Sequence, residues 1–102
     1  MSFEKNKRCL DKKEQKKYYD NHEFDEYLLS KGYEVPRNEV HEIIFGSSKT
    51  YEPFNMISLT SKNHRLAHKN IITKQDLFFA KLKYGFPIED IPENIRMEFD
   101  LE

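Results

Sequence analysis

The sequence predicts a small α+β domain in which a two-stranded hairpin leads into a helix and further helices flank both. Two short segments, residues 39–44 and 56–59, contain the apolar residues that strands favour. The second segment runs directly into Thr60 and Ser61, and a threonine there can cap a helix by accepting a hydrogen bond from its first turn. With 102 residues, the chain has room for one hydrophobic core.

We therefore expect a single domain over residues 1–102 with three regions. These are a helical N-terminal extension (1–35), the strand–strand–helix core (36–72) and a C-terminal helix with an acidic tail (73–102). Residues 4–19 have many helix formers and little apolar spacing, which leaves two interpretations. They form a solvated helix or arm, or a basic arm that contacts a DNA backbone.

Start and stop signals delimit the flanking helices. Residues 22–31 carry apolar side chains at helical spacing, between a capping Asp20 or Asn21 and a glycine, Gly32, that can end a helix. Thr73 begins a later helix that ends at Gly85. The tail has six acids against one arginine over residues 84–102 and predicts a short helix near residues 92–99. The tail could mimic phosphate, bind a protein partner or simply be solvated.

Composition bounds the class of protein. Hydrophobic residues are 37% and charged residues 34%, yet eight Phe and six Tyr provide apolar surface that a disordered chain would lack. Cys9 is the only cysteine, which excludes an intramolecular disulfide and a cysteine-based zinc site. The sequence has no run of about 18 apolar residues and no signal-peptide core. We expect an intracellular, cytoplasmic protein with no membrane partner.

Charge is distributed unevenly, although the net charge is only −1. Residues 49–83 have seven Lys and Arg against two acids, a net charge of +5. This segment contains the helix after Thr60, in which His64 and His68 lie four apart and so on one face. Two imidazoles at that spacing can bind one transition-metal ion if a third ligand comes from elsewhere, and His41 is the candidate.

The stretches EVHEI at 39–43 and NMISLTSKNHRLAH at 55–68 resemble the HNH, or ββα-metal, nucleases, most closely those of DNase-type colicins and pyocins. The resemblance covers about 30 residues, from Glu39 to His68. It implies that His41, His64 and His68 are metal ligands, that Glu39 is the acid behind them, and that Asn55 ties the loop together. The implied cofactor is one divalent ion, Zn²⁺, Mg²⁺, Mn²⁺ or Ni²⁺, and the implied host is a bacterial or phage-infected cell.

One position departs from the family pattern. The family has a second histidine directly after the first metal histidine, and that residue is the general base; here the position is Glu42. A regular strand would place His41 and Glu42 on opposite faces, so a shared site requires a bend, which Gly46 could permit. The cysteines that many HNH proteins carry around this helix are replaced by Thr60 and Asn63.

The expected function is metal-dependent hydrolysis of DNA phosphodiesters, with His41, Glu42 and Asn55 as catalytic residues. Helical geometry places basic residues beside the histidine face, and these with a lysine of the preceding loop are the expected phosphate contacts: Lys62, Arg65, Lys69 and Lys49. A homodimer would suit double-strand cleavage. Two alternatives remain: an HNH-like module that binds nucleic acid without cleaving it, and a metal-stabilised domain that binds another protein.

Overall fold

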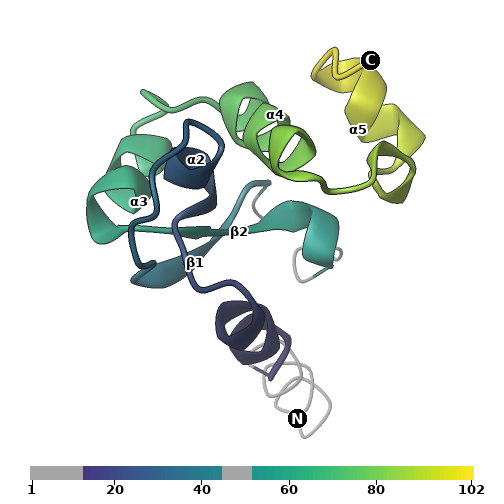
Figure 1. Cartoon of the computed structure of the whole chain (residues 1–102). Coiled ribbons are helices and arrows are strands. Elements are labelled where there is room, and N and C mark those ends of the chain that lie inside the picture. Colours follow the sequence, from purple (N-terminus) through teal and green to yellow (C-terminus); the bar gives the residue numbers. More distant parts are fainter. Residues whose placement is uncertain (1–12, 45–51) are drawn as a thin grey trace, which may run out of the picture.

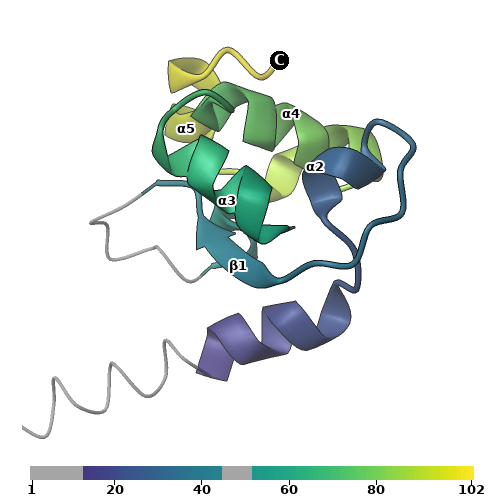
Figure 2. The ribbon, with the colours of Figure 1, turned by 90° about the vertical axis from the view of Figure 1, so that its left-hand side faces the viewer.

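Two antiparallel strands, β1 (Glu39–Glu42) and β2 (Met56–Leu59), form the centre of the computed structural model. The structure describes residues 13–44 and 52–102. The register pairs His41 with Ile57 and Glu42 with Met56. A helix over residues 13–21 lies on one side of the hairpin, and α2, α3 and α4 lie on the other (Figures 1 and 2).

The remaining elements follow the predicted order. They are α2 (Glu26–Leu29), the 3₁₀ turn η1 (Pro53–Asn55), α3 (Ser61–His68), α4 (Lys74–Tyr84), the 3₁₀ turn η2 (Ile88–Asp90) and α5 (Glu93–Glu98). The α+β class and the ββα order of β1, β2 and α3 are confirmed. None of the described helices is long and apolar enough to cross a bilayer.

Side chains from β2, from Ile43 just after β1 and from α4 form one buried core. Ile57 and Leu59 of β2 pack in a cluster with Leu77 and Phe78 of α4 and with Ile91 near the C-terminus. Phe54 of the turn η1 is buried in the same cluster. The core therefore holds α4 against the hairpin and fixes the strand from which His41 projects.

The predicted caps of α3 and α4 are confirmed. Thr60 accepts a hydrogen bond from the amide of Asn63, which starts α3 directly after β2. Thr73 and Asp76 form a reciprocal capping box, and Gly85 ends α4 in the left-handed region with a φ of 117°. The short helix expected near 92–99 is α5.

The expected helix over 22–31 is wrong in its first part. Asp20 and Asn21 belong to the helix over 13–21, and α2 begins only at Glu26. The cap is Asp25, whose side chain accepts a hydrogen bond from the amide of Leu28 at 2.8 Å. Gly32, with a φ of 95°, follows the end of α2 as expected.

A buried polar network joins the helix over 13–21 to the rest of the fold. Lys81 of α4 donates hydrogen bonds to the hydroxyl of Tyr18 at 2.8 Å and to the carbonyl of Met56 at 2.7 Å. The Tyr18 hydroxyl donates to Glu26 at 2.6 Å, and the same Glu26 oxygen accepts from the amide of Ser58 at 2.8 Å. Burial without partners would be costly for these groups, and the network satisfies them.

Candidate metal centre

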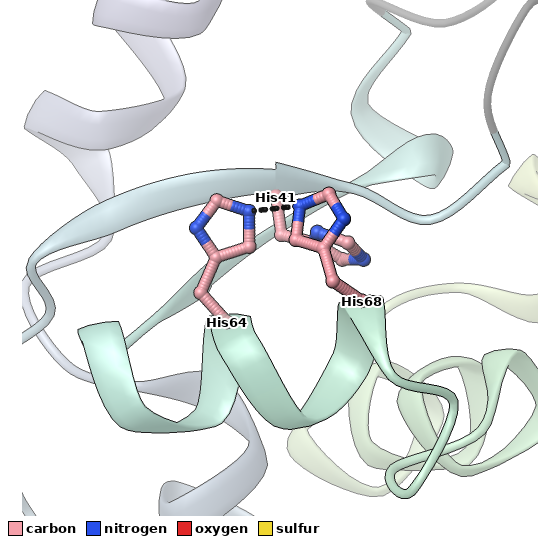
Figure 3. Close-up of side chains that lie close together, drawn as sticks. All are labelled: His41, His64 and His68. Atoms are coloured by element: carbon pink, nitrogen blue, oxygen red, sulfur yellow. Dashed lines mark hydrogen bonds between the residues drawn. The ribbon is translucent and has the colours of Figure 1, made fainter.

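Three histidines from two elements converge between β1 and α3. His64 and His68 project from successive turns of α3 toward β1, from which His41 projects (Figure 3). One ring nitrogen of each histidine lies within 4.8 Å of the others. The sequence placed these residues together by spacing and resemblance, and the structure brings them together.

The geometry fits a single ion. Nε2 of His64 and Nε2 of His68 are 3.0 Å apart. Zinc holds nitrogen ligands at about 2.0–2.1 Å, which places two ligand atoms of a tetrahedral site roughly 3.4 Å apart. Small side-chain rotations therefore suffice for shared coordination. Three protein ligands leave at least one position for water or substrate, as in catalytic zinc sites.

His41 is held in the neutral form that metal coordination requires. It is only 2% exposed, and burial together with His64, His68 and the Lys74 ammonium lowers its pKa to about 3. A neutral imidazole keeps a lone pair that a proton would otherwise occupy. His64 is partly exposed and His68 is exposed, so the centre opens to solvent on the α3 side.

Glu39 contacts His64, one of the three clustered histidines. It lies two residues before His41 on β1, and its carboxylate forms a charged hydrogen bond with Nδ1 of His64. Pairing one ring nitrogen with a carboxylate turns the other toward the ion and raises its basicity. This is the position that the resemblance gave to Glu39.

Asn55 fastens the chain just beyond His41. Its side-chain oxygen accepts from the amide of Ile44 at 2.8 Å, and its amide nitrogen donates to the carbonyl of Ile44 at 2.9 Å. The backbone amide of Ile43 also donates to the Asn55 carbonyl at 2.8 Å. These contacts are those of a residue that fixes the segment presenting His41, and they hold a bend at residues 43–44.

Asp25 fixes the N-terminus of α3, the helix that carries His64 and His68. One of its carboxylate oxygens accepts from the backbone amide of Thr60 at 2.7 Å and from the side chain of Asn63 at 3.0 Å. Thr60 and Asn63 stand where the HNH pattern, which this segment resembles, often has cysteines. A buried carboxylate thus fastens α3 in this chain. Sequence reasoning missed Asp25 because its partners lie more than 30 residues away.

Glu42 is the last residue of β1 and is partly buried. The strand is regularly paired from Glu39 to Glu42, and alternation directs adjacent side chains to opposite faces. The bend that a shared site requires comes one residue later, at 43–44. The group of side chains that could hold a metal ion contains His41 and not Glu42. Gly46, proposed as the bend, lies outside the described residues.

The expected basic residues lie on α3, which carries His64 and His68, and at its C-terminal end. Lys62, Arg65 and Lys69 are all exposed, whereas Lys49 lies outside the described residues. Sequence reasoning did not select Lys74, the first residue of α4, although its charge contributes to the lowered pKa of His41. Its position directly after the capping Thr73 could have indicated it, because the turn between α3 and α4 is short and keeps the start of α4 near His68.

No protein-family model matches the chain, and neither curated proteins nor solved structures gave a match.

Proposed function

We propose that this protein is a metal-dependent endonuclease that hydrolyses phosphodiester bonds of DNA. The observation that carries the proposal is the convergence of His41, His64 and His68, with Glu39 paired to His64 behind them. A neutral buried ligand, a carboxylate-oriented ligand and an open solvent side are features of catalytic metal centres rather than of closed structural ones.

The residues divide the work as follows. His41, His64 and His68 would hold one divalent cation, which as a Lewis acid would stabilise the charge that develops on the scissile phosphate and the leaving oxygen. Lys62, Arg65 and Lys69 offer cations to flanking phosphates from the exposed surface of α3. Asn55 keeps the backbone after His41 in place.

The proton acceptor is assigned to Glu42, with His41 as the alternative. Glutamate has an unperturbed pKa of about 4.3 and is a weaker base than imidazole, with about 6.5, so it would act through a bound water. His41 is neutral, but burial lowers its pKa to about 3, below that of glutamate, and its use as the base would leave fewer histidines for the cation.

A second candidate function has an observation of its own. Glu42 directly follows His41 on a regular strand, so alternation directs it away from the histidine face. In this alternative, the chain binds nucleic acid through an HNH-like surface and does not cleave it. The basic exposed face of α3 would serve both functions equally.

Plasmid cleavage by purified protein separates these candidates. The assay uses Mg²⁺, Mn²⁺, Ni²⁺ or Zn²⁺ in turn, with EDTA as the metal-free condition. We expect cleavage with at least one ion, and its loss in EDTA and in a His64→Ala variant. His22→Ala is the matched control, because His22 stacks on Tyr18, apart from the metal centre. DNA binding without cleavage would favour the binding module, and metal-dependent folding without DNA affinity would favour a protein-interaction domain.

A further inference from the structure

A second cationic position lies on the side of the hairpin opposite α3. The guanidinium of Arg37 stacks on the ring of Tyr19, with its central carbon 3.7 Å from the ring centroid. Its Nε and Nη2 atoms donate to the Tyr19 carbonyl at 3.3 and 3.1 Å. Tyr19 belongs to the helix over 13–21, which lies across the hairpin from α3 (Figure 2).

This arrangement fixes the guanidinium while keeping donors available. Guanidinium carries five N–H donors, and the contacts with Tyr19 use one edge of the fork. Among the described residues, no group accepts a hydrogen bond from Nη1, so the other edge can still bind an acceptor bidentately. The backbone is fixed too, because the amide of Arg37 donates to the carbonyl of Glu23 at 3.0 Å. Little conformational freedom remains to be lost on binding.

A surface hollow lies between the helix over 13–21 and β1. It has a volume of about 420 Å³, and its walls come from the helix over 13–21 (Gln15, Lys16, Tyr19) and from β1 (Glu39, Val40). Tyr19 carries Arg37, and Glu39 contacts His64. Two residues that line the hollow therefore contact the guanidinium and one of the three histidines, respectively.

The charges at this surface favour a phosphate anion over an apolar group. Lys16 lines the hollow, although it is paired with Asp20 at 2.9 Å, and Lys13 and Lys17 are exposed on the same helix. The Glu39 carboxylate is directed to His64. Arg37 is the one cation here that is held in a fixed orientation by both a ring and a carbonyl.

We propose that Arg37, supported by Tyr19, binds a backbone phosphate of the nucleic acid on the hairpin side of the metal centre. This inference rests on the proposed function, since it extends the same bound strand. Lys62 and Arg65 on α3 and Lys69 at its end are exposed, and phosphates bound by them and by Arg37 would flank the three histidines. A strand held on both sides places an intervening phosphate at the histidines.

The test measures binding without metal, so that it does not depend on cleavage. Fluorescence anisotropy with a 20-base-pair labelled duplex in EDTA gives Kd and its salt dependence for wild type and variants. Arg37→Gln should raise Kd roughly three- to tenfold. Each phosphate contact contributes about 0.9 to the slope of log K against log salt, so this slope should fall by about that amount.

Matched variants separate a fixed contact from general charge. Lys83→Gln removes one exposed charge from α4 and should change neither quantity beyond error. Arg37→Lys keeps the charge but loses the planar fork, and should recover only part of the affinity. Tyr19→Leu retains Arg37 and removes its platform, and should weaken binding while the salt slope stays near wild type. Thermal unfolding followed by circular dichroism checks that each variant is folded.

Three results would overturn the inference. They are an unchanged Kd and slope in folded Arg37→Gln, an equal loss in Lys83→Gln, and a wild-type protein with no affinity for the duplex. If Arg37→Gln fails to fold, the Arg37→Lys and Tyr19→Leu pair decides by the same criteria. Duplex binding through Arg37 without cleavage under any ion would retain this inference and reject hydrolysis. If wild type and Arg37→Gln cleave DNA equally and bind it equally, the proposed hydrolysis stands and the role of Arg37 is rejected.

Discussion

The carboxylate of Glu39 accepts a hydrogen bond from Nδ1 of His64 across the space between β1 and α3. An ionised carboxylate can only accept, so Nδ1 carries a proton, and in the neutral imidazole Nε2 then carries the lone pair. That same Nε2 faces Nε2 of His68 at 3.0 Å. One strand residue thus selects the tautomer in which a helix residue can ligate a cation.

Replacing Glu39 by Gln should weaken metal binding without abolishing it. The amide can still accept from Nδ1, but the negative charge that raises the basicity of the imidazole is lost. Outer partners of this kind contribute about 10- to 100-fold to metal affinity. Isothermal calorimetry with Zn²⁺ measures the change, and Glu34→Gln, at an exposed position, is the control. Equal affinities for Glu39→Gln and wild type would show that this contact does not support the site.

Removing two of the three proposed metal ligands should abolish specific binding of Zn²⁺. A His64→Ala, His68→Ala double variant leaves only His41 from the group, and a single imidazole cannot hold the ion tightly. Calorimetry with Zn²⁺ should then give no saturable binding, whereas His22→Ala should bind as wild type does. Undiminished binding by the double variant would place the metal elsewhere.

Neutralising α3 should weaken binding to all DNA sequences alike. Phosphate contacts position a protein without reading bases, so Lys62→Gln, Arg65→Gln and Lys69→Gln together should lower affinity with little change in sequence preference. If all three contact phosphates, the salt slope should fall by about 2.7. Anisotropy titrations at several salt concentrations measure it. A slope equal to that of wild type would mean that these side chains are only solvated.

Glu42 is tested by two opposite substitutions. Glu42→Gln removes a proton acceptor of nearly the same shape, so turnover should fall by about 10²- to 10⁴-fold while metal and DNA binding persist. Glu42→His supplies the histidine of the HNH pattern that this segment resembles, and should keep or raise activity. Wild-type turnover in Glu42→Gln would move the base elsewhere, with His41 first. Activity in Glu42→His alone would identify the natural chain as a binding module.

Because Lys81 is buried, we expect the free energy of unfolding to rise as the pH increases above about 8. Burial lowers its pKa to about 8, well below the value in an unfolded chain, so between these values the unfolded state binds more protons. The free energy of unfolding should therefore rise with pH above about 8, by at most about 1.4 kcal/mol per pH unit. Urea denaturation from pH 8 to 9.5 should show this slope in wild type relative to Lys81→Met.

The control for that measurement is Lys83→Met on the same helix, because Lys83 is exposed. It should keep the wild-type slope. If Lys81→Met and wild type run parallel over this range, Lys81 keeps its proton in the folded state despite its burial.

Local rules were sufficient for the elements whose signals lie within a few residues. Thr60 and Thr73 cap α3 and α4 where the sequence predicts, because each cap bonds an amide three residues on. The pairing of His64 with His68 follows from helical spacing alone. The predicted partnership with His41 needed the hairpin, whose two strands are marked by their apolar residues.

Residues that act over long sequence separations were not predicted. Asp25 and Glu26 resemble an ordinary acidic surface turn, yet both are buried because amides of β2 and α3 lie against them. The same contacts explain why α2 begins later than expected: the Asp25 side chain bonds Leu28, Thr60 and Asn63 together. No pattern within the first 35 residues indicates those partners.

The position of Asp25 and Glu26 determines whether the segment with the three histidines can be excised or grafted. Residues 36–72 contain all three histidines but neither Asp25 nor Glu26. A peptide cut to that range would leave the amides of Ser58 and Thr60 without the carboxylates that receive them. The ββα motif of this chain thus depends on contacts from outside residues 36–72. A graft of the motif into another scaffold must include α2 and its cap Asp25.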